Sequence, residues 1–296
     1  MKSTANMFLQ CLEVEKGYSP NTIEAYRLDV QKGLIPFLYQ QGKFKVSEVT
    51  SENIQAYLDF LAHGRGNCNA ARGRKLAAIK SFFNYLVDSG QLEASPAASI
   101  KSPKITEREP DYLTDDECIR LLDTVSKRAW RRVSKRDIAI IVLFLHTGIR
   151  VSELINLKLA NVDLKSGCIR IMRKGKKEQY LPLNRETVAV LTKYIDARPK
   201  AINGRLFVRP SGRDLDRTTI YRVVRRYLAL AGIDKGKRGP HLLRHTFCTR
   251  LHQKGVDPLV IRDLAGHKSI ATTMRYIKIE SKEQVAAISK LEFGTI

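Results

Sequence analysis

The stretch HLLRH, residues 241–245, places two histidines four positions apart around an arginine, in a chain of 296 residues with six histidines. Such a pair could supply half of a zinc site or part of an anion site. Zinc needs three or four ligands, but no cysteine lies nearby and the helical H-E-x-x-H arrangement lacks its glutamate here. Arg244 would also repel a divalent cation. The stretch therefore favours an anion, and more cationic donors are expected elsewhere.

The sequence supplies these donors on both sides of the stretch. Upstream, TGIRVSEL sets Arg150 three residues before Glu153, where the two side chains can meet on one helical face. Downstream, LAGH ends on His267, and MRY brings Tyr276 nine residues later. An arginine stays charged at any relevant pH and donates two parallel hydrogen bonds. These properties suit a phosphate group.

The ordered set TGIRVSEL, RKGKKEQYLPL, HLLRHTFCTRL, LAGH and MRY resembles the tyrosine recombinase (phage integrase) family, most of all its Xer-type and simple integrase members. Two earlier segments, SPNTIEAYRLDV and LAAIKSFFNYLV, resemble the N-terminal core-binding domain of that family. The resemblance thus spans essentially the whole chain. Any one motif is weak, but five in this order and spacing form a strong signal.

The resemblance implies a site-specific DNA recombinase. Its catalytic residues around the scissile phosphate would be Arg150, Lys174, His241, Arg244, His267 and Tyr276. Tyr276 would attack the phosphate and form a 3′-phosphotyrosine, and the strands would be exchanged through a Holliday junction without metal, ATP or another cofactor. Glu153 would hold Arg150 in place. The expected partner is double-stranded DNA with specific recombination sites, bound by a homotetramer or by a heterotetramer with a second recombinase.

General chemistry supports these assignments independently of the family. Attack on a phosphodiester builds negative charge on the nonbridging oxygens, so catalysis is mainly positioning and charge stabilisation, for which Arg150 and Arg244 serve as clamps. His241 and His267 can donate hydrogen bonds to the same oxygens, and either could exchange a proton with the tyrosine. Lys174, among other cations, could have a lowered pKa and protonate the leaving 5′ oxygen. The sequence leaves open which histidine is the base.

Charge points to the same partner. Lysine and arginine number 52 against 30 acidic residues, a net charge of +22, which favours a polyanion. Residues 1–110 hold 14 basic and 11 acidic side chains and the remainder 38 and 19, so the excess lies in the second part. Five scattered cysteines indicate a reducing compartment without disulfides. The longest apolar run, IAIIVLFL, has eight residues, so a soluble, cytoplasmic protein is expected.

Two domains are expected, in a fold that is mainly α with a small β-sheet (α+β). Residues 1–105 form an all-helical, SAM-like core-binding domain, and residues 106–112 belong to a proline-rich linker without periodicity. Residues 113–296 form a mixed catalytic domain, whose C-terminal helix would dock on a neighbouring subunit according to the resemblance. The same resemblance implies a C-shaped clamp around DNA.

Local patterns predict individual elements. Ser19 and Pro20 begin a helix, a second runs from Thr50 to Gly64, and Thr114 begins one with acidic residues in its first turn. Residues 136–157 form a long, mostly buried helical region, and residues 167–183 form a β-hairpin with a basic tip.

Several basic side chains outside the catalytic set are predicted to contact DNA, with a solvated surface as the ordinary alternative for each. They are Arg72, Arg74, Lys75, Lys176, Lys177, Arg222, Arg225 and Arg226. Two other functions stay open from sequence. A type IB topoisomerase would use the same cleavage chemistry without a specific site or second DNA partner. A DNA-binding regulator of the same fold would have lost catalysis, although it would not need the nucleophile Tyr276.

Overall fold

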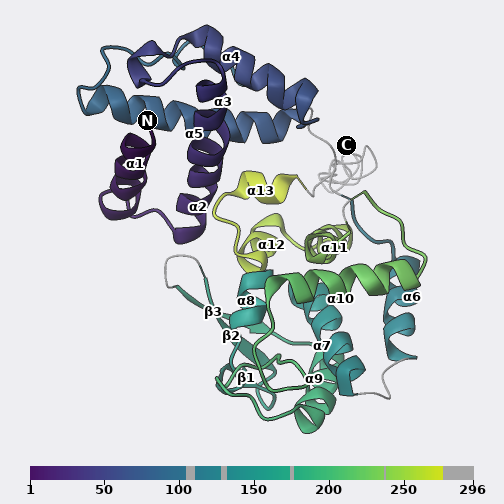
Figure 1. Ribbon diagram of the computed structural model, residues 1–296. Helices are drawn as coiled ribbons and strands as arrows, with labels where there is room; N and C mark the ends of the chain where they lie inside the picture. The colour runs from purple at the N-terminus through teal and green to yellow at the C-terminus, as the bar shows by residue number, and fades with distance from the viewer. Residues whose placement is uncertain (105–110, 128–131, 174–176, 237, 276–296) are drawn as a thin grey trace, which may run out of the picture. The chain divides into compact units, whose positions relative to one another are not determined.

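The chain forms two compact units, Met1–Glu107 and Arg108–Ile296, shown in Figure 1. The computed structural model describes residues 1–104, 111–127, 132–173, 177–236 and 238–275. Both units are mainly helical and the second carries a small sheet, which confirms the predicted fold class. Most of the predicted linker and the whole predicted docking helix lie outside the described residues, and the domain boundaries stay predictions. No described helix is long and apolar enough to cross a membrane.

The first unit is built from helices that pack around an aromatic core. They are α1 (Lys2–Val14), α2 (Pro20–Asp29), the π-helical η1 (Val30–Leu34), α3 (Ile35–Gln40), the short 3-10 turn η2 (Val46–Glu48), α4 (Ser51–Asp59), the π-helical η3 (Phe60–Gly64) and α5 (Asn69–Asp88). Phe8 of α1 meets Phe82 of α5 edge to face, with ring centroids 5.4 Å apart. Helix α5 buries its apolar face, with Leu76, Ile79 and Phe83 fully covered.

Helix α2 begins as its sequence predicts, but its continuation differs. Ser19 is the N-cap and Pro20 occupies the first turn. The helix then passes through the π-helical η1 into α3, where Pro36 occupies the first turn. Proline has no N–H to bond to the carbonyl four residues back, so the regular helical ladder is interrupted before it. A Cβ on Gly33 would lie 2.5 Å from the Tyr57 hydroxyl, which requires glycine in this turn.

The second unit packs its helices and a small sheet around one hydrophobic core. Its elements are α6 (Asp115–Ser126), α7 (Arg132–Thr147), α8 (Val151–Asn156), the 3-10 turn η4 (Leu159–Asn161), β1 (Val162–Asp163), β2 (Cys168–Met172), β3 (Glu178–Pro182), α9 (Arg185–Ala197), α10 (Arg217–Leu230), α11 (Pro240–Gln253), α12 (Pro258–Ala265) and α13 (Ile270–Met274). Thr114 caps α6 and Glu117 bonds back to it, which confirms the predicted start.

The predicted hairpin is present and is extended by a third strand. The antiparallel order is β1-β2-β3, with Ile169 opposite Leu181. Ile169 and Ile171 are buried, while Arg170 faces outward and pairs with Glu178 across the strands. The alternation therefore directs one face of β2 into the core and leaves its end, at Arg173, beside the helices.

The predicted continuous helical region at 136–157 is divided in two. Helix α7 ends at Thr147 and α8 begins at Val151. Gly148 lies between them with φ +59°, the left-handed conformation that usually ends a helix. The break takes Arg150 out of the helix and makes it the N-cap of α8.

Candidate active site

The turn between α7 and α8 fits only a glycine at position 148. A Cβ there would lie 2.4 Å from Cδ1 of Phe247, a buried ring of α11. Thr147 stabilises the turn, because its hydroxyl donates to the Leu143 carbonyl at 2.6 Å and accepts from the Ile149 N–H at 3.3 Å. The turn thus joins the end of α7 to α11 and sets the position of Arg150.

We expect Gly148→Ala to lower the free energy of unfolding by about 2–4 kcal/mol, since it combines a strained left-handed residue with overpacking against Phe247. Urea unfolding of the purified protein measures this. Gly255→Ala is the matched control, because Gly255 has φ +77° and a Cβ added to it would meet nothing within 4 Å. Equal losses in the two variants would show that the contact with Phe247 does not matter.

Arg150 and Glu153 form a double contact at the start of α8. The Arg150 backbone N–H donates to Oε2 of Glu153 at 2.8 Å, and its Nη1 donates to Oε1 at 2.9 Å. The carboxylate thus caps the helix and orients the guanidinium at once. The predicted pair is therefore present, but it spans the helix start, not a helical face, because Gly148 precedes it.

Arg244 lies in the middle of α11 and is buried. Its Nη1 donates to the Gly148 carbonyl and its Nη2 to the Ala265 carbonyl at 2.6 Å. Burial, followed by the charge of Arg150, lowers the pKa of Arg244 to about 10. The side chain therefore stays protonated at pH 7.

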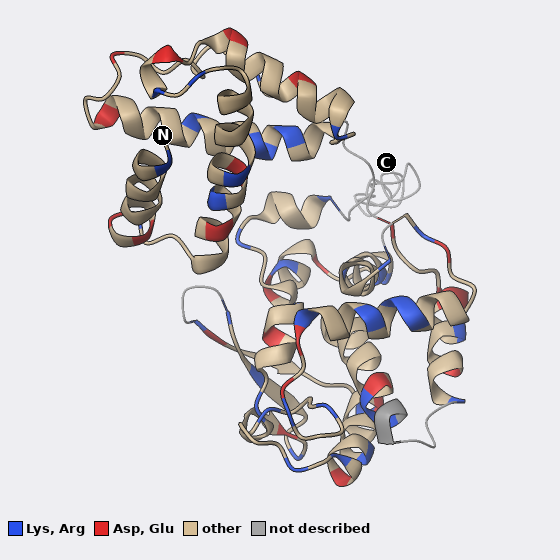
Figure 2. Cartoon of the chain, in the orientation of Figure 1, with Lys and Arg blue, Asp and Glu red and all other residues tan. Residues whose placement is uncertain are grey.

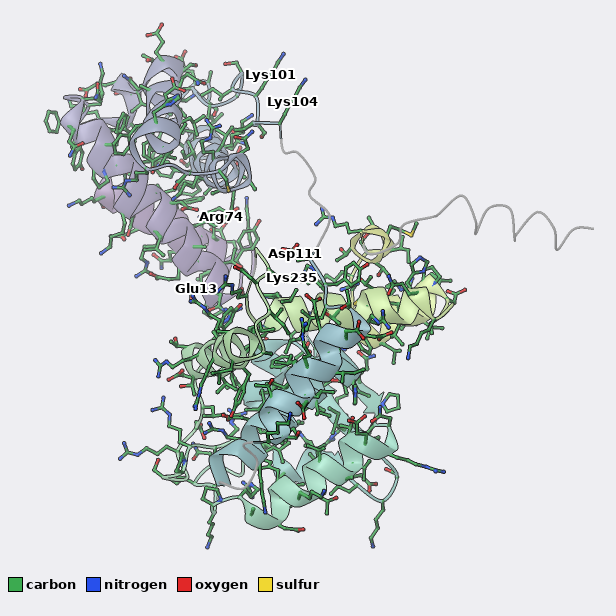
Figure 3. The ribbon with its side chains drawn as sticks, turned by 90° about the vertical axis from the view of Figure 1, so that its right-hand side faces the viewer. Glu13, Arg74, Lys101, Lys104, Asp111 and Lys235 are labelled. Carbon is green, nitrogen blue, oxygen red and sulfur yellow. The ribbon has the colours of Figure 1, made fainter. Side chains whose placement is uncertain are left out.

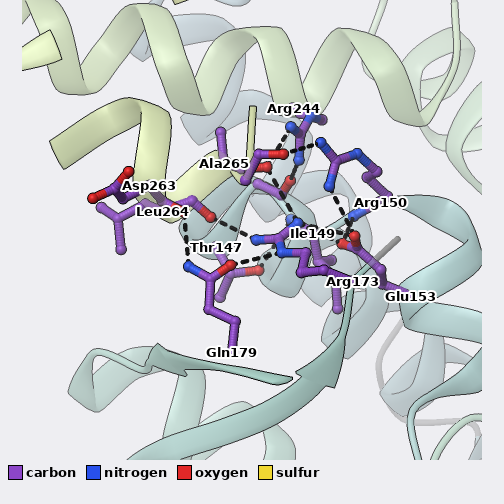
Figure 4. A network of polar contacts seen from close by, with 12 residues as sticks. Thr147, Ile149, Arg150, Glu153, Arg173, Gln179, Arg244, Asp263, Leu264 and Ala265 are labelled. Atoms are coloured by element: carbon purple, nitrogen blue, oxygen red, sulfur yellow. Dashed lines mark hydrogen bonds and ion pairs between the residues drawn. The ribbon is translucent and has the colours of Figure 1, made fainter. Parts of the chain in front are cut away.

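Helix α12 ends in a set of backbone carbonyls that bind arginines (Figure 4). Gly266 adopts φ +64° and closes the helix, and its N–H bonds to the Asp263 carbonyl. The Ala265 carbonyl accepts from Arg244, and the Gly266 carbonyl accepts from Arg150. The last carbonyls of a helix carry partial negative charge, so guanidinium groups are stabilised there.

His267 follows this helix end directly. Its Nδ1 lies 2.9 Å from the Thr273 hydroxyl of α13. Burial, followed by the charges of Arg244, Arg150 and Arg173, lowers its pKa to about 4. His267 is therefore neutral at pH 7.

The predicted catalytic residues that the structure describes come from separate elements of the second unit. Arg150, Arg244 and His267 all meet at the end of α12, as the contacts above show. His241 lies one turn before Arg244 on α11, and its ring meets that of Tyr221 edge to face, with centroids 6.4 Å apart. Lys174 and Tyr276 lie outside the described residues. Among those described, no group of three or more histidine, cysteine or acidic side chains could hold a metal ion.

One residue of this centre was not predicted. Arg173 lies just beyond β2 and contacts Glu153 with 2.9 Å from its Nη1 to each carboxylate oxygen. In the sequence it belongs to the run RKGKK, where each cation reads as part of a solvated turn. Ile169 and Ile171 face the core, and strand alternation continues this inner face to Arg173, so the period of two was the sequence signal that could have found it.

Of the predicted DNA-binding residues, some pair within the first unit, others are exposed in the second unit, and one lies outside the described residues. In the first unit, Arg74 (Figure 3) and Lys75 both pair with the buried Asp29, with 2.9 Å from the lysine Nζ to Oδ1. Arg72 donates to Asn69. The structure thus gives these cations partners within their own unit, and their contact with DNA stays a prediction.

In the second unit, the three predicted arginines of α10 are exposed, and Figure 2 shows blue lysine and arginine segments along the ribbon of this helix. They are Arg222, Arg225 and Arg226. Lys177 is exposed, and its carbonyl accepts the Arg173 N–H at 2.8 Å. Lys176 lies outside the described residues. The α10 arginines remain candidates for a nucleic-acid surface.

Two family models match the chain. The model described as "Phage integrase family" matches residues 111–283, and "Phage integrase, N-terminal SAM-like domain" matches residues 5–90. Together they cover both compact units.

Individual proteins are similar over nearly the whole length. Tyrosine recombinase XerC of Thermodesulfovibrio yellowstonii is 32% identical, covering 96% of this chain and 94% of that protein. Tyrosine recombinase XerD of Proteus mirabilis is 34% identical, covering 93% and 88%. Among solved structures, XerA recombinase is 29% identical with a TM-score of 0.54 over 99% of both chains. XerH bound to its difH substrate is 23% identical with a TM-score of 0.76, over 99% of this chain and 85% of XerH.

Proposed function

Because this chain belongs to the phage integrase family of tyrosine recombinases, we propose that its site-specific recombination of DNA proceeds through a covalent 3′-phosphotyrosine on Tyr276. The tyrosine oxygen forms a bond to phosphorus while the bond from phosphorus to the 5′ oxygen breaks. The phosphodiester energy is kept in the new bond, so the strand is rejoined to another 5′-hydroxyl without ATP or metal. Two rounds of exchange pass through a Holliday junction.

The observation that carries this proposal is the meeting of Arg150, Arg244 and His267 at the end of α12. The two guanidinium groups are held by backbone carbonyls and a carboxylate before any substrate arrives. Donors fixed in advance lower the cost of reorganisation when charge develops on the phosphate oxygens. Such a centre stabilises the transition state of phosphoryl transfer through positioned cations.

The remaining roles follow from proton balance. Lys174 gives a proton to the leaving 5′ oxygen, and His241 or His267 takes the proton of Tyr276. A histidine with a pKa near 4 is a weak base at pH 7, and its neutral ring suits hydrogen bonding to a phosphate oxygen. The negative charge of the bound phosphate offsets part of the arginine field and raises that pKa again.

The proposed partner is double-stranded DNA with specific sites, as for XerH, whose structure holds its difH substrate. Four subunits act on two sites, as a homotetramer or together with a second recombinase, and the C-terminal tail joins neighbouring subunits. Exposed arginines of α10 contact the phosphate backbone. The reaction takes place in the cytoplasm.

Trapping on a nicked suicide substrate tests this function. Duplex DNA with candidate sites loses a short 5′-hydroxyl fragment after cleavage, so rejoining is blocked and the adduct accumulates. We expect the protein to form a covalent adduct in the presence of EDTA and without ATP, and peptide mapping to place the DNA on Tyr276. DNA that is bound but never linked, or an adduct that requires a divalent metal, would contradict the proposal.

A further inference from the structure

Arg173 is held by many contacts, whereas Lys177 of the same run RKGKK is exposed. The Arg173 side chain is 8% exposed, and all three guanidinium nitrogens donate hydrogen bonds. Nε donates to Oε1 of Gln179 at 2.7 Å, and Nη2 donates to the Leu264 carbonyl at 2.8 Å. Nη1 donates to both oxygens of Glu153 and to the Ala265 carbonyl at 3.2 Å. One side chain thus ties β2, β3, α8 and α12 together (Figure 4).

Through Glu153, Arg173 reaches the phosphate clamps. The Glu153 carboxylate accepts from Arg150 on one side and from Arg173 on the other. Arg173 and Arg244 also share the Ala265 carbonyl. Removal of Arg173 therefore loosens the carboxylate that orients Arg150 and the helix end that orients Arg244. A 1 Å displacement of such groups is enough to lower a rate about 100-fold.

The guanidinium also lies flat against the end of α12. A Cβ on Gly266 would lie 2.6 Å from Cζ of Arg173. The left-handed glycine that closes α12 is therefore also the surface on which Arg173 packs. This close approach fixes the backbone that leads directly into His267.

The third guanidinium changes the charge around His267. The charged and titratable groups that face this histidine are Arg244 and His245 of α11, Arg150 before α8, and Arg173 beyond β2. Glu153 pairs with Arg150 and with Arg173, so its carboxylate offsets part of their charge. Each uncompensated cation opposes protonation of the ring.

We propose that Arg173 is a positioning residue for DNA cleavage, which holds the pair of Glu153 and Arg150 and the carbonyl end of α12 in one arrangement. The inference rests on the proposed function and adds a residue to it. Geometry and charge make separate contributions: the fork sets the positions of Arg150 and Arg244, and the charge adds to the field that opposes protonation of His267. A lysine retains the second contribution and loses the first.

The test compares Arg173→Met and Arg173→Lys with the wild type by single-turnover cleavage of the suicide substrate, by DNA affinity, and by NMR titration of labelled histidines. His267→Gln assigns the His267 signal. In R173M we expect cleavage to fall about 100-fold because the clamps are displaced, while DNA affinity changes less than about threefold because backbone contacts remain. The pKa of His267 rises by about 0.5 unit because one cation is lost.

Arg173→Lys separates the two contributions. We expect cleavage to fall about 10-fold, since a single ammonium nitrogen cannot reach all the acceptors that the planar fork of Arg173 contacts, with the pKa of His267 unchanged. Arg170→Met is the matched control. Arg170 lies on the same strand and pairs with Glu178 and Asn161, so its loss should change cleavage by less than about twofold.

Several results would overturn the role of Arg173. The role is wrong if R173M cleaves at the wild-type rate. It is also wrong if this variant loses cleavage rate and DNA affinity by the same factor. Should R173M fail to fold, Gln179→Ala removes one acceptor of Arg173 and keeps its charge. That variant should cleave more slowly with an unchanged pKa of His267, and wild-type cleavage by it refutes the inference. A wild type that forms no adduct refutes the proposed function instead, whatever the variants do.

Discussion

Tyr276→Phe is expected to abolish covalent attachment to DNA, because phenylalanine keeps the ring but has no oxygen to attack phosphorus. Binding to the recombination site should persist, since affinity for DNA comes mainly from contacts with the phosphate backbone. The measurement pairs a denaturing gel of the suicide substrate with a native binding assay at the same salt concentration. Loss of the adduct with retained binding separates chemistry from recognition.

The control for this variant is Tyr180→Phe. Tyr180 lies exposed on β3, with 63% of its surface accessible, and the proposed chemistry does not use it. Its replacement should leave the amount of adduct unchanged. If Y276F still forms a covalent adduct with DNA, another side chain attacks the phosphate, and the assignment of Tyr276 is wrong.

Arg244→Lys is expected to lower the cleavage rate by about 10²–10³-fold, the usual loss when one donor to a developing oxyanion is removed. Arg244 is buried and bridges the Gly148 and Ala265 carbonyls with two nitrogens. A lysine has no fork, so it cannot make both contacts and still face the phosphate. Single-turnover rates on the suicide substrate measure the effect.

The same variant should acquire a pH dependence of its own. Burial and Arg150 lower the pKa of Arg244, and this environment lowers that of a lysine from about 10.4 toward neutrality. A lysine with a lowered pKa loses its charge as pH rises, so the residual cleavage should fall between about pH 7 and pH 9. Wild-type cleavage should not fall for this reason, because an arginine with a pKa near 10 stays charged.

Arg250→Lys serves as the control on the same helix. Arg250 forms a partly exposed ion pair with Asp115, and a lysine keeps the charge of that pair, so the exchange should cost at most about 0–1 kcal/mol. Its cleavage rate and pH profile should follow the wild type. A rate for R244K equal to that of R250K would show that Arg244 does not act on the phosphate.

The sequence predicted the elements whose signals are local. Ser19 before Pro20 and Thr114 before acidic residues are capping patterns, and the alternation of Ile169 and Ile171 belongs to a half-buried strand. The division after Thr147 was missed, because the apolar periodicity continues across it. Gly148 ends α7 in the left-handed conformation, and the contact that fits only a glycine there comes from Phe247, nearly a hundred positions away in the chain.

The sequence motifs predicted which residues form the candidate site, but not the contacts that hold those residues in place. Arg150, Arg244 and His267 could be named because their motifs follow in a known order, and the structure brings these three together. Of the two arginines that pair with Glu153, Arg150 was predicted and Arg173 was not, because Arg173 reads as one more cation in a basic turn. Likewise, Arg74 and Lys75 read as surface charges, and only the fold reveals the buried Asp29 that they neutralise.

Because the arginine acceptors at the end of α12 are main-chain oxygens, the centre has considerable mutational robustness. A backbone carbonyl persists through substitution of its own side chain, so the exposed Asp263 is free to vary as long as the helix ends in the same place. The exception is Gly266, which no other residue replaces without meeting Arg173. Sequence drift along α12 can therefore be tolerated on its outer face without altering the chemistry beneath it.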